Sequence, residues 1–195
     1  MSISNEAGVA GFLRKRNRHE RAAFTLYGAA VSAARDPYLY ETLGVPDTLD
    51  GRFDAIGLHV FLLIRRLTPD GTLGKELAQA VFDAMFTDMD VNLREMGVSD
   101  LSVGRRNRAM WEALHGRAAV YTENWDDPVG LAASIARNVW RGARPPEGAA
   151  PALARLAHAQ AAHLAAQPIE ALAKGKAHYL PAKEAAQCSP NAPAP

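Results

Sequence analysis

Apolar residues recur along this chain at spacings of three and four positions, which is the period of an amphipathic helix. Segments rich in proline and glycine, such as "TPDG" and "GARPPEG", interrupt the pattern. No stretch shows the strict alternation that is typical of a half-buried strand. The sequence therefore predicts an all-α fold, a single-domain bundle of about six helices. The predicted helices cover approximately residues 20–35, 50–67, 72–96, 102–123, 128–141 and 149–166.

Residues at the predicted helix ends support these boundaries. Asp50 is expected to cap the second helix, and Gly51 would let the backbone approach a neighbouring segment closely. Gly97 suits the position just after the third helix, and Pro128 suits the first turn of the fifth. We assign a structural role to the turn that orients the second helix, which contains Asp47, Asp50, Gly51 and Arg52.

The second predicted helix is apolar on two opposite faces. One wide face follows residues 53–67, Leu58 and Leu62 lie opposite, and narrow polar strips contain Asp54 and His59. Such a helix is either buried in the middle of its domain or uses one face to meet a partner. Both alternatives remain open, and a buried His59 would need a hydrogen-bond partner.

The third and fourth predicted helices carry methionine and aromatic side chains. Phe82, Met85, Phe86 and Met89 share an arc of roughly 100°, which predicts either a core stripe or a surface that adapts to a partner. Asp90 and Arg94 form an i,i+4 pair on the same helix. The fourth helix presents Met110 and Trp111 on one side, and its first turns hold Arg105, Arg106 and Arg108.

Composition narrows the class of protein. The chain has 195 residues, of which 48% are hydrophobic and 22% charged, as in a globular protein. The formal net charge of +1 is too small to attract nucleic acid over long range, so no DNA partner is expected. Cys188 is the only cysteine, so no internal disulfide is possible. No run of about 18 apolar residues predicts a membrane span, and the N-terminus lacks the apolar core of a secretory signal.

Residues 1–11 are small and polar, and we expect a flexible N-terminus there. Residues 12–180 are expected to form the helical domain, and residues 181–195 a disordered tail rich in alanine and proline. A basic run follows the N-terminal segment. It is either the solvated start of the first helix or a patch that rests on anionic headgroups. Its members are Arg14, Lys15, Arg16, Arg18 and Arg21.

Motifs that carry chemistry are scarce. "GTLGK" lacks the spacing and the Ser or Thr of a phosphate-binding loop. Glu112 and His115 have the Glu-x-x-His spacing of ferritin-like iron sites, which need a second such pair and two further glutamates. The residues therefore predict no catalytic site, no metal and no cofactor. Two alternatives stay open: a ferritin-like metal enzyme, and a helical carrier of quinone, haem or lipid with His59 as an axial ligand.

Five segments of the chain together resemble a known family. They are "LYGAAVSAARDPYLY", "GVPDTLDGRFDAIGLHVFLLIRRL", "FDAMFTDMDVNLREMGVSDLSVGRRNRAM", "GRAAVY" and "NWDDPVGLAASIARNVWRG". The chain is similar in these segments to the ubiquinol–cytochrome c reductase chaperone family, over roughly residues 12–180, and looks like its bacterial form.

The resemblance implies an ATP-independent assembly factor of the cytochrome bc1 complex that binds newly made cytochrome b. It also implies work in the bacterial cytoplasm, peripheral to the inner membrane, and in mitochondrial relatives a small partner subunit. We expect the client-binding face on the second to fourth predicted helices. The candidate residues are Leu58, Leu62, Phe82, Met85, Phe86, Met89, Met110 and Trp111.

Overall fold

A computed structural model of the protein describes residues 3–141 and 143–188, except for the side chains of residues 3–18 and of Leu101. Its six longer helices are α1 (Ile3–Ala34), α3 (Leu49–Leu67), α4 (Gly71–Glu95), α5 (Asp100–Glu123), α6 (Pro128–Val139) and α7 (Ala149–Ala165). No strand occurs in this described part of the chain. The predicted all-α fold with about six sizeable helices is therefore confirmed.

Three short helices accompany them: α2 (Pro37–Glu41), α8 (Ile169–Leu172) and α9 (Ala182–Gln187). The last of these corrects the prediction that residues 181–195 form a disordered tail. Three alanines of α9 are buried where this helix packs against α7: Ala182, Ala185 and Ala186. The ordered chain therefore extends to Cys188. Residues 189–195 lie outside the described residues. The first helix also begins earlier than predicted, at Ile3, and thus includes most of segment 1–11.

Local interactions explain where the central helices begin and end. Thr48, and not Asp50 as predicted, caps α3: its side-chain oxygen accepts a hydrogen bond from the backbone N–H of Gly51 at 3.1 Å. Gly97 follows α4 with φ of 76°, and the N–H of Val98 reaches back to the carbonyl of Leu93 at 3.1 Å. This is the Schellman geometry that the sequence predicts at Gly97.

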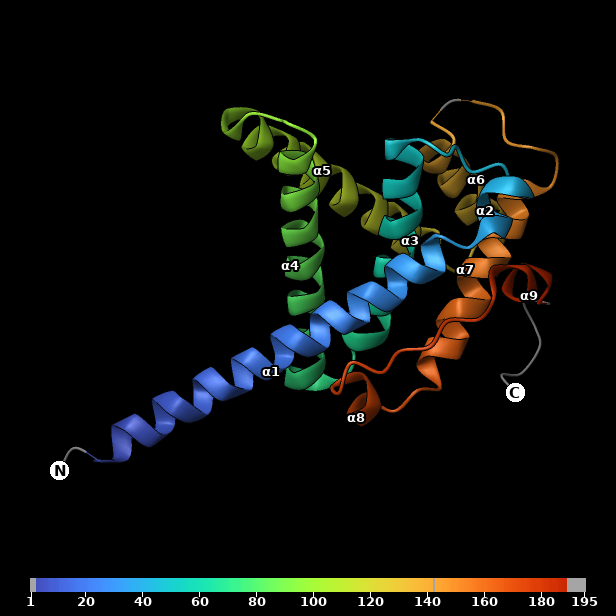
Figure 1. Ribbon diagram of the computed structural model, residues 1–195. Coiled ribbons are helices and arrows are strands. Elements are labelled where there is room, and N and C mark those ends of the chain that lie inside the picture. Colours follow the sequence, from blue (N-terminus) through green and yellow to red (C-terminus); the bar gives the residue numbers. More distant parts are fainter. Residues whose placement is uncertain (1–2, 142, 189–195) are drawn as a thin grey trace.

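Helix α3 lies in the middle of the molecule and contacts α1, α4, α6 and α7 (Figure 1). Leu58, Val60, Leu62 and Leu63 are each at most 2% exposed. Of the two alternatives for this doubly apolar helix, burial is therefore the one observed for most of its surface. Figure 1 shows α4 and α5 on one side of α3, and α7 with α9 on the other.

Residues 173–188 form a C-terminal strap that follows α7 back to α9 (Figure 1). The side-chain amide of Gln160 donates to the carbonyl of Leu180 at 2.7 Å and accepts from its N–H at 2.8 Å. Gln167 makes the same two bonds with His178. Each glutamine thus satisfies the backbone N–H and C=O of one residue in a segment that has no regular secondary structure there.

Candidate functional site

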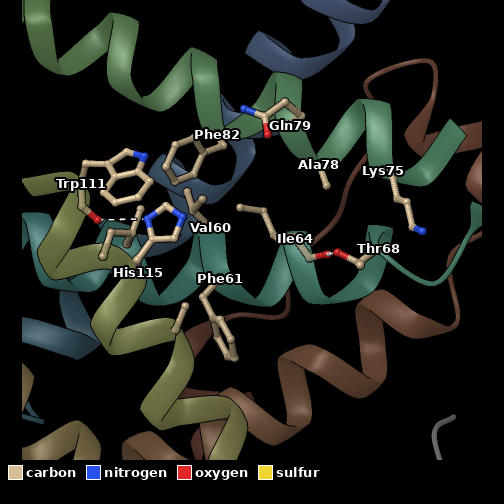
Figure 2. Close-up of a pocket in the computed structure, with 12 residues that line it drawn as sticks. Val60, Phe61, Ile64, Thr68, Lys75, Ala78, Gln79, Phe82, Trp111 and His115 are labelled. Carbon is tan, nitrogen blue, oxygen red and sulfur yellow. Dashed lines mark hydrogen bonds between the residues drawn. The ribbon is translucent and has the colours of Figure 1, made fainter. Parts of the chain in front are cut away.

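An apolar groove of about 560 Å³ lies between α3, α4 and α5 (Figure 2). Eight of its twelve lining residues are apolar, and they come from all three helices: Val60, Phe61 and Ile64 from α3, Ala78 and Phe82 from α4, and Trp111, Leu114 and Ala118 from α5. The groove opens to solvent, because Trp111 is 46% exposed and Thr68, Gln79 and His115 on its rim are also exposed. We call this feature the α3–α4–α5 groove.

Aromatic rings crowd one end of the groove (Figure 2). The imidazole of His115 stacks on the indole of Trp111 with 3.9 Å between ring centroids, and it meets Phe82 edge-on at 5.1 Å. Phe82 in turn contacts Phe86 at 4.7 Å. A half-exposed tryptophan held by ring contacts is a rigid apolar anchor, which is the kind of residue that contributes most at protein interfaces.

A second hollow of about 830 Å³ lies on the other side of α4, toward α1. Although it is larger, seven of its ten lining residues are polar or charged, among them His19, Glu76 and Asp83. An apolar partner bound there would have to remove these charged groups from water, which opposes binding. The α3–α4–α5 groove is the better candidate site.

The wall formed by α5 is positioned by a close approach to α3. A Cβ atom at Gly57 would lie 3.0 Å from a methyl carbon of Leu114. Gly57 is buried within α3, where glycine is unfavourable for the helix itself, so its role is to admit the side chain from α5. This contact lies beside the groove, since Leu114 is also one of its lining residues.

A buried carboxylate also joins the same two helices. Asp54 on α3 pairs with Arg117 on α5 at 2.8 Å and with Arg141, just after α6, at 2.8 Å. Arg141 also pairs with Asp50 at 2.9 Å and has φ of 47°, which is uncommon for a residue other than glycine. The sequence pattern placed Asp54 in a polar strip but could not reveal partners so distant along the chain.

The structure divides the eight predicted client-binding residues into two groups. Leu58, Leu62, Met85 and Met89 are between 0% and 7% exposed and belong to the hydrophobic core. Side chains packed against other helices cannot contact a partner in this conformation, so this packing does not favour their assignment to a client-binding face, which stays a prediction. Periodicity identifies apolar positions but not which of two apolar faces is covered.

The other four predicted residues remain near the surface. Phe82 and Trp111 line the groove, Phe86 packs on Phe82, and Met110 is partly buried against the core. Sequence reasoning missed the groove's floor. It assigned Val60 and Ile64 to the wide apolar face of one helix without a function, and it gave Phe61 no role. It also missed Lys75 and Gln79 on the rim.

Of the four residues predicted to shape the turn that orients α3, Asp47 precedes the helix, whereas Asp50, Gly51 and Arg52 lie in its first turn. The guanidinium of Arg52 lies 2.6 Å from the carboxylate of Asp47, and both side chains are largely exposed. Hydrogen bonding to Arg52 lowers the pKa of the Asp47 carboxyl. A Cβ atom at Gly51 would come within 2.0 Å of the carbonyl oxygen of Pro46, so only glycine fits this close approach.

The predicted basic run is only partly described. Arg21 is exposed on α1, whereas the side chains of Arg14, Lys15, Arg16 and Arg18 lie outside the described residues. The arginines at the start of α5, Arg105, Arg106 and Arg108, are all exposed, and Arg108 pairs with Glu112 at 3.0 Å.

The residues that suggested a metal or haem site have other roles in the structure. Glu112 pairs with Arg108 and His115 stacks on Trp111. Among the described residues, no three His, Cys, Asp or Glu side chains are grouped so that they could hold a metal ion. His59 lies in the core and its Nδ1 donates to the carbonyl of Ala55 at 2.8 Å, while Nε2 has no hydrogen-bond partner. It is not among the groove's lining residues.

No helix in the described part of the chain is long and apolar enough to cross a membrane.

Comparison with known proteins shows the family to which this chain is similar. The family model described as "Ubiquinol-cytochrome C chaperone" matches residues 41–179. That range includes α3 to α7 and therefore every residue that lines the α3–α4–α5 groove. The chain belongs to the ubiquinol-cytochrome C chaperone family. Its members are assembly chaperones of ubiquinol–cytochrome c reductase, which is respiratory complex III, as the resemblance noted in the sequence indicates.

Two relatives support membership of the ubiquinol-cytochrome C chaperone family. The crystal structure of the Cbp3 homolog from Brucella abortus covers 90% of this chain and 98% of its own, with 30% sequence identity and a TM-score of 0.78. "Ubiquinol-cytochrome-c reductase complex assembly factor 1" of Xenopus laevis is 28% identical over 120 residues, which is 60% of this chain. That match also spans 60% of the length of the Xenopus protein.

Proposed function

We propose that this protein is an assembly chaperone of the cytochrome bc1 complex that holds newly made cytochrome b through the α3–α4–α5 groove. The observation that carries the proposal is an apolar floor beside a half-exposed tryptophan. An exposed apolar surface of this kind marks a site of interaction with a protein, a membrane or a ligand, and an open groove suits a segment of another protein. Membership of the chaperone family supports the same interpretation.

In this proposal the protein binds without catalysis and without ATP. Affinity comes from apolar surface removed from water, at about 25 cal/mol per Å² before ordering costs are subtracted. A client that is itself a membrane protein supplies apolar side chains which are unpaired until it is assembled. Release follows when haem insertion or a partner subunit competes for the client.

The proposed place of work is the cytoplasmic face of the bacterial inner membrane. There the basic run that includes Arg21 would contact anionic headgroups, which attract nearby lysine and arginine by about 1 kcal/mol per residue. Sedimentation with vesicles containing phosphatidylglycerol tests this part, because electrostatic binding must weaken as salt is raised. A small partner subunit, as the family resemblance implies, also belongs to the proposal.

The decisive experiment is co-purification of cytochrome b with tagged variants, expressed in a bacterium that lacks the native gene. Trp111→Asp places a charge at the exposed anchor of the groove and should reduce captured cytochrome b at least tenfold, as loss of an interface anchor does. Val129→Asp is the matched control, because Val129 is 78% exposed on α6 and away from the groove. Circular dichroism confirms that both variants fold.

Assembled bc1 complex is measured in the same strains by haem absorbance and native gels. Trp111→Asp should lower the amount of complex, and Val129→Asp should not. Equal capture of cytochrome b by both folded variants would show that the groove is not the binding site. Normal bc1 levels in the strain without the gene would overturn the proposed function altogether.

The carrier alternative has one observation in its favour, since 560 Å³ lies in the range of small-molecule pockets. Titration with haem and with a quinone analogue, followed by absorbance and by tryptophan emission, separates it from the chaperone proposal. Stoichiometric binding that survives in the presence of cytochrome b segments would favour the carrier.

A further inference from the structure

The α3–α4–α5 groove has one charged residue in its lining, and that residue lies at one end. The twelve lining residues include one lysine, Lys75, and no arginine, aspartate or glutamate. Figure 2 shows Lys75 and Thr68 at the end opposite to Trp111 and His115. The groove is therefore polar and cationic at one end and aromatic at the other.

The arginines and acids around Lys75 already have partners or face elsewhere. Arg66 pairs with Asp70, and His19 lies 3.5 Å from the carboxylate of Glu76 on the α1 side of α4. Lys75 lies on the ridge between the two hollows, because it lines both. Its long stem can cover apolar surface in the groove while the ammonium group reaches the open end.

The size of the groove limits what it can hold. Its lining extends from Val60 on α3 to Thr68, just after that helix, and on α4 from Lys75 to Phe82. At about 1.5 Å per residue these stretches are roughly 10–12 Å long, which corresponds to about two turns of a helix. An occupant thus contributes side chains from two successive turns, at positions i, i+3 or i+4, and i+7.

The lining also indicates the backbone conformation of the occupant. All three walls are helices, whose N–H and C=O groups are bonded within each helix. An extended segment lying here would find no sheet edge for its own backbone groups, and leaving these unpaired is costly. A helix satisfies its backbone internally and needs only apolar side chains to fill the floor.

Resting on the proposed function, we infer that the groove takes about two turns of an apolar helix whose one end carries a carboxylate side chain, and that Lys75 pairs with this carboxylate. The aromatic end formed by Trp111 and His115 then receives the apolar end of the helix. The ion pair fixes the direction in which the client lies, whereas the apolar floor supplies most of the affinity. The groove thereby selects one class of client segment and one orientation.

The test uses three synthetic 16-residue peptides rich in Ala and Leu, which differ only in having Glu, Gln or Lys at one end of the apolar stripe. Affinity for the full-length protein is measured by fluorescence anisotropy of the labelled peptides at low and high salt. The Glu peptide should bind about two- to fivefold more tightly than the Gln peptide, as expected for a partly exposed ion pair, and the Lys peptide more weakly. High salt should reduce these differences.

Charge reversal in the protein makes the test specific. Lys75→Glu should invert the order of the three peptides, and Lys75→Met should abolish it while leaving the Gln peptide almost unaffected. Lys174→Glu is the matched control, because Lys174 is exposed near α8 and outside the groove's lining. This control variant should keep the wild-type order.

Four outcomes would overturn the inference. Equal affinities for the three peptides, or the same order in Lys75→Glu, would show that Lys75 does not pair with the occupant, while capture of cytochrome b could still support the proposed function. Absence of binding by every peptide would exclude a helical occupant. Displacement of the Glu peptide by oleate at an equal concentration would indicate that the groove is built for a fatty acid.

Discussion

The carboxylate of Asp54 lies 2.8 Å from the guanidinium of Arg117, and this ion pair joins α3 to α5 with no part of the Asp54 side chain exposed. Burial raises the pKa of the Asp54 carboxyl above its ordinary value, although hydrogen bonding and charge from Arg141 and Arg117 act in the opposite direction. Because α3 and α5 are two walls of the groove, this pair belongs to the framework that keeps the groove open.

Breaking the pair should be costly because it leaves Arg117 largely buried without a counter-charge. We expect Asp54→Leu to lower the free energy of unfolding by about 3 kcal/mol. Adding Arg117→Met should recover most of that loss, since replacing both partners by apolar residues removes the uncompensated charge. Urea unfolding of the two single variants and the double variant checks this, and additive losses would contradict it.

His59 should make the free energy of unfolding depend on pH. Burial lowers the pKa of the His59 imidazole. In the unfolded chain this imidazole is protonated below about pH 6.5, whereas in the folded protein it stays neutral to a lower pH. Stability that is present above this pH is therefore lost as the pH falls, with a slope of up to about 1.4 kcal/mol per unit for one group.

The variant His59→Leu should flatten this dependence between pH 7.5 and 5.5, as measured from urea midpoints at several pH values. Part of the slope should remain, because burial also lowers the pKa of His158. An unchanged slope in His59→Leu would show that His59 does not cause the acid sensitivity.

Two glycines of the groove walls should respond in opposite ways to substitution. A larger side chain at Gly57 would collide with Leu114, so Gly57→Val should destabilise the fold by roughly 1–3 kcal/mol and weaken client binding by moving α5. A Cβ atom at Gly116 on α5 would meet nothing within 4 Å, so Gly116→Ala should stabilise the protein by up to about 1 kcal/mol. Thermal unfolding compares the two, and equal effects would refute the proposed contact.

The C-terminal strap should depend on Gln160, which is 1% exposed. Gln160→Leu leaves both peptide groups of Leu180 without their partner, and we expect a loss of about 2–3 kcal/mol in the free energy of unfolding. Limited proteolysis should then cut within residues 173–188 before the rest of the bundle. Gln187→Leu, at an exposed position on α9, is the control and should resist like the wild type.

Several elements followed from local sequence signals. Gly97 follows α4 as predicted and has a positive φ, and Pro128 begins α6 as predicted, because caps and proline constraints act within a few residues. The predicted Asp90–Arg94 pair is present at 2.6 Å, since positions i and i+4 are always neighbours on a helix. The cap at α3 was misplaced by two residues, because both Thr48 and Asp50 are good capping residues.

The residues of the candidate groove were predicted less well. The three helices that were expected to form it do enclose the groove, but only Phe82 and Trp111 of the eight candidates line it. Leu58 and Met85 are as apolar as these two residues and are fully covered. Their sequence patterns do not differ, because exposure depends on where neighbouring helices cross.

The sequence by itself determined that this chain forms about six amphipathic helices, where most of them begin and end, and which family the protein resembles. Those properties depend on periodicity, capping and contiguous blocks of residues, all of which are local. Only the tertiary structure decided that α3 is covered on nearly every side, that Asp54 meets Arg117 and Arg141, and that Lys75 stands at the end of an apolar groove. The physical reason is that packing joins residues far apart in the chain, and the crossing of helices is set by the fit of whole surfaces rather than by any single segment.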